Sequence, residues 1–436
     1  MSRWIRVAEG PAPFLPGAAV LAVVLGYGVN VPFWDQWELV ELLSRLDDGG
    51  VGWADLYRQH NEHRMVFPKI LMLALSSVTR WNVVAEMLVG VALASGSFCL
   101  LLSLARPALQ MTDPVSRFWA VLAMSAILFS LAQWENWLWG WQIQWHLGVF
   151  AALLSIWLAA RSLRHPKPFL PVIGAAASAT LCQFSIASGV IVWLCSGLVL
   201  AAHPRRRAIL SAWTMPAIIA SAVFLVGYER AADAPQIVPV LQAPFAYLLY
   251  IGNYLSGPLL RHWTAGIAIA AVFAALAFAA TMRRPRDLEF VLPWMAVGTF
   301  AIGNAILTAI GRVGLGPQQG LAARYVTISL LLSIAIIPLG LAALKEGHRL
   351  SPAKRLAAIG GAALLSILTI ASDIGNWRRS AAHGLAMAEA RACLLAIEEA
   401  SDACLAQLYP NAAVIRSREP QLRAFGWSGF ASPTTR

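Results

Sequence analysis

Charged side chains are scarce in this chain of 436 residues, since Asp, Glu, Lys and Arg together make up only 13% of it. A soluble domain normally carries about 25% charged residues, whereas 58% of this chain is hydrophobic. Hydrophobic runs of about 20 residues recur from end to end, which is the length of a membrane-spanning helix. These proportions exclude a disordered chain, a coiled coil and a soluble Rossmann enzyme. They predict an all-α polytopic membrane protein.

Motifs of common soluble enzymes are also missing. The sequence has no CxxC pair, no HExxH and no Ser, His and Asp in the order of a hydrolase triad. Charged residues are almost absent from the hydrophobic runs, so a proton-relay transporter lacks its usual groups. Five cysteines are too few for a disulfide scaffold. Cys99, Cys182 and Cys195 lie in hydrophobic runs, where we expect inert packing residues.

Hydrophobic windows of about 19 residues predict eleven membrane spans. They cover roughly 13–31, 82–105, 117–133, 143–161, 168–183, 185–202, 208–227, 262–282, 288–311, 325–345 and 354–373. Two further stretches, 66–79 and 244–260, are shorter or interrupted, and we interpret them as helices in the membrane interface. The predicted domains are a transmembrane domain at 1–373, with a long first outer loop at 32–81, and a small helical tail at 374–436.

Positive charge favours one orientation, because cytoplasmic loops of membrane proteins are enriched in Lys and Arg. With the N-terminus cytoplasmic, 17 of the 33 cations lie in inner segments and nine in outer loops. The inner cations are Arg3, Arg6, Arg106, Arg117, Arg161, Arg164, Lys167, Arg205, Arg206, Arg207, Arg283, Arg284, Arg286, Lys345, Arg349, Lys354 and Arg355. The net charge of +11 is thus assigned to topology and membrane lipids, and not to nucleic acid. We expect the active site and the tail on the periplasmic or extracellular face of a bacterial inner membrane.

The first outer loop concentrates polar residues that suit catalysis. Asp35 and Glu38 follow the first span three residues apart, so on a helix they share one face. A carboxylate at the end of a span is unfavourable without partners. His60, Glu62 and His63 follow in the same loop and are expected to contact substrate. They could also ligate a divalent cation, although His-x-Glu-His is not a known closed-site spacing, and the sequence requires no cofactor.

A second outer loop is rich in tryptophan, with five Trp between residues 134 and 145. Such an aromatic surface suits stacking against sugar rings or contact with a lipid chain. A dense interfacial belt is the alternative interpretation. The residues expected to bind substrate here are Trp134, Glu135, Asn136 and Gln142.

A third outer loop is rich in glycine and lies between Arg312 and Arg324. It lacks the Lys-Ser/Thr of a P-loop, which excludes that kind of phosphate cradle. The guanidinium groups of Arg312 and Arg324 suit phosphate oxygens, and Arg64 offers a third. We therefore expect these arginines to bind a substrate phosphate, with Tyr325 beside the substrate. Anchoring to lipid headgroups is the alternative.

The tail carries the two remaining cysteines, Cys393 and Cys404, inside an amphipathic stretch at 385–408. On an unbroken helix these residues lie roughly 16 Å apart, too far for a disulfide. A helix break near Ser401 would allow them to pair, and we predict a disulfide. Two unpaired thiols on one helix face are the alternative.

This arrangement resembles the GT-C glycosyltransferases, polytopic enzymes that take a sugar from a polyprenyl-phosphate carrier. In that superfamily a first span leads into a long outer loop with an acidic motif near its start, followed by interfacial helices. The motif Trp34-Asp35-Gln36-Trp37-Glu38 and the 66–79 helix are similar to that layout, and the resemblance is strongest over 13–105. Many members have two adjacent acids, whereas Gln36 follows Asp35 here, which leaves a metal requirement open.

The resemblance implies transfer of a sugar from a polyprenyl-phosphate donor to a hydroxyl of a glycan or lipid-linked acceptor. Asp35 takes the catalytic acidic position and would accept the proton, while Glu38 is the nearby second acid. Arg312, Arg324 or Arg64 would stabilise the departing phosphate. Direct attack would invert the anomeric carbon, and a retaining course would need Glu38 as nucleophile. A flippase for a lipid-linked saccharide, an O-antigen polymerase or ligase, and a non-catalytic assembly subunit stay open as alternatives.

Overall fold

The computed structural model describes residues 10–47, 49–110, 112–230, 235, 237–257, 259–283, 288–344 and 351–430. Within these residues the chain is almost entirely helical, and the extended backbone amounts to one isolated bridge between His60 and His63. The predicted all-α class is therefore confirmed for the part of the chain that the structure describes.

Eight helical segments of the described chain are long and apolar enough to cross a membrane. They comprise α6 (Val83–Leu109), α7 (Pro114–Leu128) with α8 (Trp134–Leu138), α9 (Ile143–Ser162), α12 (Arg206–Leu225), α14 (Trp263–Arg283), α15 (Leu288–Arg312), α16 (Val326–Leu344) and α17 (Pro352–Leu395). Each coincides with a predicted span. The other three predicted spans coincide with the shorter helices α2 (Leu15–Tyr27), α10 (Phe169–Gln183) and α11 (Ile191–Leu200). The helices thus support a multi-span protein without fixing the number of spans at eleven.

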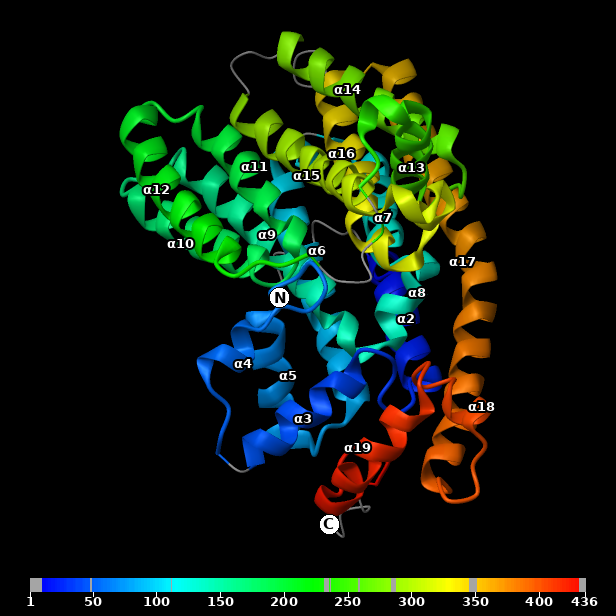
Figure 1. The fold of residues 1–436 in the computed structure, drawn as a ribbon. Helices are drawn as coiled ribbons and strands as arrows, with labels where there is room; N and C mark the ends of the chain where they lie inside the picture. The colour runs from blue at the N-terminus through cyan, green and yellow to red at the C-terminus, as the bar shows by residue number, and fades with distance from the viewer. Residues whose placement is uncertain are drawn as a thin grey trace.

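The two interfacial stretches are also helical. They form α5 (Val66–Thr79) and α13 (Pro244–Ser256). Together with α3 (Gln36–Asp47) and α4 (Trp53–Tyr57), α5 lies at one end of the molecule, beside α18 (Asp402–Leu405) and α19 (Ala412–Phe425) (Figure 1). We call this end, which holds α3 to α5, α18 and α19, the tail end.

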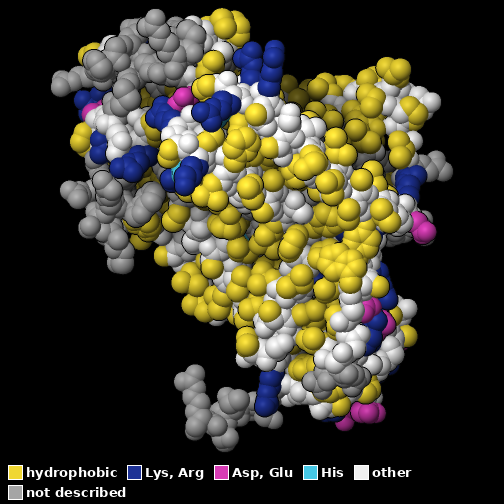
Figure 2. Space-filling model, turned by 90° about the vertical axis from the view of Figure 1, so that its left-hand side faces the viewer, with side chains coloured by type: hydrophobic (Ala, Val, Ile, Leu, Met, Phe, Trp, Pro, Cys, Tyr) yellow, Lys and Arg dark blue, Asp and Glu magenta, His cyan; other side chains and the backbone are white. Residues whose placement is uncertain are grey.

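The surface of the helical body is hydrophobic, as a bilayer requires. Figure 2 shows hydrophobic side chains across the middle of one face, while Lys and Arg gather at its upper left and charged groups reappear toward the lower end. The large exposed hydrophobic side chains include Leu170, Leu194, Ile218, Phe278 and Ile367. Patches of this extent are unfavourable in water, so they indicate the surface that faces lipid.

Helix α17 extends from the membrane region into the tail without a break at the predicted domain boundary (Figure 1). Its 44 residues span about 66 Å at 1.5 Å per residue, twice the ~30 Å hydrocarbon core. The tail helix expected at 385–408 needs correction, because α17 ends at Leu395 and the chain then turns before α18. The break allows the chain to reverse and return toward α3.

Cations at the end of α6 opposite the tail end take part in ion pairs between loops. Arg164 pairs with Glu289, and Arg355 pairs with Asp113 at 2.9 Å. Each of these two contacts joins a different pair of the inner segments that the charge pattern assigned to the cytoplasmic side. Several of the inner cations named above lie outside the described residues, namely Arg3, Arg6, Arg284, Arg286, Lys345 and Arg349.

Candidate functional site

The acidic motif begins at a tight turn between α2 and α3. Trp34 has a φ of 48°, in the left-handed region that is unfavourable for a bulky side chain, so neighbouring contacts must hold it there. Its backbone N–H donates to the carbonyl oxygen of Leu408 at 2.7 Å. The N–H of Phe33 donates to Oε1 of Gln36 at 3.2 Å. These hydrogen bonds fix the backbone on both sides of Asp35.

Gln36 connects this turn to the start of α6. Its Nε2 donates to Oε2 of the buried Glu86 at 2.8 Å, and Trp81 Nε1 donates to the other Glu86 oxygen at 3.1 Å. Gly140 passes so close that a Cβ there would clash with the Glu86 carboxylate. We did not predict Glu86 as a site residue, although an acid four residues into a hydrophobic run is a usable signal.

The structure places His60 between the two carboxylates of the motif. Its Nε2 lies 3.4 Å from Asp35 Oδ2, and its Nδ1 lies 3.0 Å from Glu38 Oε2. Burial by itself disfavours the imidazolium, but hydrogen bonds and charges from Asp35 and Glu38 outweigh it and raise the pKa of His60 to about 9. The ring is therefore protonated at neutral pH. Trp141 packs against it with ring centroids 5.0 Å apart.

The turn formed by residues 60–63 contacts Arg312, which lies far away in the sequence. Two backbone hydrogen bonds between His60 and His63, at 2.9 and 2.8 Å, close the turn. Glu62, inside the turn, accepts hydrogen bonds from Nε of Arg312, at 3.0 Å, and from its Nη2. Two of the expected groups, the acidic motif and Arg312, thus meet at a turn of four residues. We call Asp35, Glu38, His60, Glu62 and Arg312 the central network.

The pKa values of Glu62 and His63, both in this turn, are shifted far from their ordinary values. Burial opposes ionisation of Glu62, but His63, which is charged at the acidic pH where Glu62 titrates, and Arg312 outweigh burial and lower the pKa of Glu62 to about 2. Burial lowers the pKa of His63 itself to about 4, so this ring is neutral near pH 7 and the guanidinium of Arg312 is the charge that acts on Glu62. Nδ1 of His63 accepts a hydrogen bond from the Ala187 N–H at 2.9 Å, which fixes the neutral tautomer.

Arg64 is buried, and its described hydrogen bonds go to backbone carbonyls and not to the central network. It donates to the carbonyl oxygens of Phe224 at 2.7 Å, Tyr57 at 3.0 Å and Val226 at 2.5 Å. Its guanidinium also lies over the Tyr57 ring, 4.0 Å from the centroid. Arg64 therefore joins the first loop to the end of α12.

Arg324 lies beside the second loop. Its carbonyl oxygen accepts a hydrogen bond of 2.9 Å from Asn136 Nδ2, which also donates to Thr327 Oγ1 at 2.5 Å. Electrostatic interactions link Glu135 to Arg324 and to Arg261. The described contacts thus group Arg324 with Glu135 and Asn136, and not with Asp35.

Aromatic rings connect these two regions. Trp145 lies 6.0 Å from the ring of His63 and 6.2 Å from that of Tyr325. On the other side, His383 of α17 lies 5.2 Å from Trp134 and 5.4 Å from Phe33, measured between ring centroids. Of the predicted residues, Tyr325 is thus linked through Trp145 to His63, whereas Trp134 packs against His383 of α17.

A buried polar atom without a partner occurs next to His60. Nε1 of Trp141, whose ring packs against His60, is shielded from solvent and makes no hydrogen bond within the described residues, and Oε1 of the following Gln142 is also unpaired. Native proteins pair most such atoms, so the position of Trp141 Nε1 beside the central network suits a polar ligand. No group of three or more His, Cys, Asp or Glu that could hold a metal ion occurs in the described residues.

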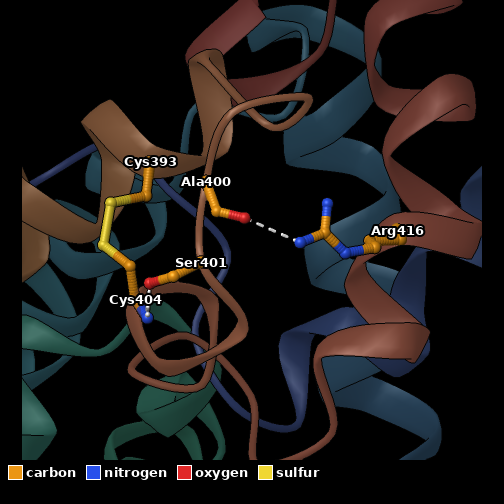
Figure 3. The surroundings of a disulfide bond; sticks show 5 residues. All are labelled: Cys393, Ala400, Ser401, Cys404 and Arg416. Atoms are coloured by element: carbon orange, nitrogen blue, oxygen red, sulfur yellow. Dashed lines mark hydrogen bonds between the residues drawn. A yellow bond between two sulfur atoms is a disulfide. The ribbon is translucent and has the colours of Figure 1, made fainter.

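The tail is closed by a disulfide between Cys393 and Cys404, whose Cα atoms lie 6.3 Å apart. Figure 3 shows how the chain between them is held: Arg416 of α19 donates to the Ala400 carbonyl at 2.7 Å, and Ser401 caps α18. The sequence did not reveal that the tail contacts the acidic motif. Leu408, just after α18, holds Trp34, and Arg418 of α19 donates to the Trp37 carbonyl at 2.5 Å.

No protein-family model, no curated protein and no solved structure matches this chain.

Proposed function

We propose that this protein is an integral-membrane glycosyltransferase that moves a sugar from a polyprenyl-phosphate carrier to an acceptor hydroxyl on the outer face of a bacterial inner membrane. The central network is the observation that supports the proposal. It contains the Asp35 carboxylate, just after the first hydrophobic segment, and the guanidinium of Arg312, which follows its partner Glu62 by 250 residues. The reaction needs a base for the acceptor and a cation for the leaving phosphate. Both are present in this network.

Asp35 is the proposed base. Its side chain is 26% exposed and can meet a substrate, whereas the His60 ring is only 10% exposed. The acceptor oxygen bonds to the anomeric carbon, its proton passes to Asp35, and the bond from that carbon to the phosphate oxygen breaks with its electron pair. Direct attack inverts the anomeric carbon. A well-placed base contributes roughly 10²–10⁴-fold to the rate.

His60 and Glu38 are proposed as positioning residues. The protonated ring of His60 bridges the two carboxylates and holds Asp35 in one orientation. Glu38 keeps the ring charged. A retaining course would use Glu38 as the nucleophile instead, and the configuration of the product distinguishes these two roles.

Arg312 is proposed to stabilise the departing phosphate. Its Nε and Nη2 bind Glu62, while Nη1 has no hydrogen-bond partner among the described residues and stays available. A fixed cation beside developing negative charge is a large source of catalysis. Arg64 is left out of this role because three backbone carbonyls already use its guanidinium.

The test uses purified protein and a set of polyprenyl-phosphate-linked hexoses and pentoses. Release of polyprenyl phosphate and formation of glycosylated acceptor are measured together with donor binding. Asp35→Asn should bind donor normally and turn over at least 100-fold more slowly. Glu41→Gln is the matched control: Glu41 lies in α3, the helix that begins directly after Asp35, and its exposed side chain pairs only with Arg45 among the described ion pairs, so the variant should keep full activity.

Full turnover by Asp35→Asn would remove Asp35 as the base. A flippase would move the intact lipid-linked sugar from one leaflet of a vesicle membrane to the other without releasing polyprenyl phosphate. A polymerase or ligase would release a polyprenyl diphosphate from a longer saccharide donor.

A further inference from the structure

A cleft of about 490 Å³ lies between the ends of three membrane helices. The last two turns of α6, the end of α9 with residues 164–166, and the first two turns of α15 line it. Cavities that bind small ligands usually measure about 300–1,000 Å³. The cleft is therefore large enough for a ligand, and its lining includes no residue of the central network.

The cleft and the central network lie at opposite ends of α6. This helix begins at Val83, one turn before Glu86, which binds Gln36 beside Asp35. Ser103, in the cleft, follows Val83 by about 20 residues, or about 30 Å along the helix. Because the hydrocarbon core of a bilayer has this thickness, the cleft lies at the headgroups of the other leaflet, which the charge pattern predicts to be cytoplasmic.

Two arginines of the cleft differ in their partners. Nε of Arg164 pairs with Glu289, so the charges of these two groups offset each other. Arg161 lies over the ring of Trp157, 4.8 Å from its centroid, and makes no hydrogen bond or ion pair with the described residues. An excess of about one positive charge thus remains at Arg161, and its N–H groups are free to bind an anion.

The ring beside Arg161 is fixed in place. Nε1 of Trp157 donates to Ser103 Oγ at 2.9 Å, a hydrogen bond that joins α9 to α6. A cation–π contact holds a guanidinium without using a conventional hydrogen bond. Arg161 is therefore positioned before a ligand arrives, which reduces the entropy lost on binding.

Apolar side chains make up much of the remaining lining. Leu104 and Pro107 of α6 and Phe290 and Pro293 of α15 line the same cleft as Arg161. A ligand in the cleft therefore meets a cation and an apolar surface together, and a phospholipid offers the matching phosphate and hydrocarbon. Basic pockets between membrane helices on the cytoplasmic side bind lipid headgroups in this way. Inorganic phosphate would bind Arg161 but leave the apolar lining uncovered.

We propose that this cleft binds an anionic phospholipid, with the phosphate on Arg161 and the glycerol and first acyl carbons against Leu104 and Phe290. The charge decides between headgroups: a lipid with one net negative charge, such as phosphatidylglycerol, neutralises Arg161, whereas zwitterionic phosphatidylethanolamine does not. Binding there requires no sugar transfer, so the proposal goes beyond the proposed function.

Native mass spectrometry of the detergent-purified chain tests the cleft with phosphatidylglycerol, phosphatidylethanolamine, diacylglycerol and inorganic phosphate. We expect phosphatidylglycerol to bind most tightly and Arg161→Gln to raise its Kd at least fivefold. Arg161 is exposed, so this variant is expected to fold. Trp157→Leu keeps every charge but removes the ring beside Arg161, and it should raise the Kd at least threefold. Arg206→Gln, at an exposed arginine outside this cleft, is the control and should change the Kd less than twofold.

Unchanged affinity for phosphatidylglycerol in Arg161→Gln would overturn the proposal, and so would an equal loss in Arg206→Gln, which would indicate attraction to surface charge in general. Equal binding of phosphatidylethanolamine or diacylglycerol would remove the anion, and equal binding of inorganic phosphate would remove the lipid. Asp35→Asn separates this proposal from the transferase. That variant should bind phosphatidylglycerol with unchanged affinity even if the protein transfers no sugar.

Discussion

The backbone N–H of Trp34 donates a hydrogen bond of 2.7 Å to the carbonyl oxygen of Leu408, so the C-terminal tail holds the residue directly before Asp35. Leu408 follows the short turn that Cys393 and Cys404 close. The disulfide is therefore connected to the proposed base through few contacts. It closes the turn before Leu408, Leu408 binds the N–H of Trp34, and Trp34 is joined to Asp35 by the peptide bond. Because Trp34 has a positive φ, loss of that hydrogen bond allows the turn to relax.

Removal of the disulfide should weaken both the tail and the site. A crosslink over a short loop stabilises a fold by about 2–4 kcal/mol, and we expect the tail to unfold at lower temperature in the Cys393→Ser/Cys404→Ser variant. Turnover should fall about tenfold, because Asp35 loses its fixed position. Thermal unfolding and turnover, with and without dithiothreitol, measure the two effects.

Cys99→Ser is the control for this prediction, since Cys99 is an exposed free thiol elsewhere. Dithiothreitol should affect the natural chain and the Cys99 variant alike, and should not change the double variant further. Equal turnover before and after reduction would show that the tail does not position Asp35.

His60 should make stability depend on pH in the alkaline range. Its pKa is about 9 in the folded protein against 6.5 in an unfolded chain. A raised pKa means that the stabilisation is complete below about pH 6.5 and disappears as the pH rises through 9. The contribution is on the order of 3 kcal/mol. We therefore expect the unfolding temperature to fall between pH 7 and 10.

The comparison with His60→Gln isolates this titration from that of other groups. The variant should start less stable at pH 7 and lose less stability toward pH 10, so the two curves converge. Parallel curves would contradict the assignment of a charged His60 between Asp35 and Glu38.

The membrane helices could be located from sequence because apolar length alone marks them, and the helical arithmetic for Cys393 and Cys404 correctly required a break between them. The tertiary partners could not be derived in this way. Arg64 and Arg312 are the same residue type in similar outer loops, yet one binds backbone carbonyls and the other binds Glu62. The two arginines have different partners because Arg64 lies against the end of α12, whereas Arg312 is the last residue of α15.

The contact between Trp34 and Leu408 leaves no trace in the sequence, because it joins two backbone groups that every pair of residues possesses. Glu86 is the opposite case. A carboxylate inside a hydrophobic run needs buried partners, and Gln36 and Trp81 supply them. That signal was present in the sequence, but the identity of the partners required the fold.

Arg312 and Glu62 should be coupled in both stability and catalysis. The pKa of Glu62, about 2, lies below that of an unfolded glutamate, 4.5. A lowered pKa means that the stabilisation is present above about pH 4.5 and is lost as the pH falls through 2. Arg312→Gln should slow turnover about 100-fold, because the leaving phosphate loses its cation, while Glu62→Gln leaves that cation in place and should cost less than tenfold.

A double-variant cycle measures the pair directly. Unfolding of Glu62→Gln, Arg312→Gln and the double variant should give a coupling energy of about 1–3 kcal/mol. Additive effects on stability would show that the ion pair contributes nothing, and an equal loss of turnover in both single variants would remove the special role of Arg312.

Gly140→Ala should disturb Asp35 from a distance. An added Cβ would clash with the Glu86 carboxylate and lie 2.9 Å from Nε2 of Gln36, so the hydrogen bond that holds the Asp35 turn must shift. Overpacking of this kind destabilises by about 1–3 kcal/mol, and displacement of a reacting group by about 1 Å can slow catalysis roughly 100-fold. Gly375→Ala in α17 is the matched control, because its Cβ would meet nothing within 4 Å. If both variants keep full turnover and stability, the connection from Gly140 through Glu86 and Gln36 does not position the base.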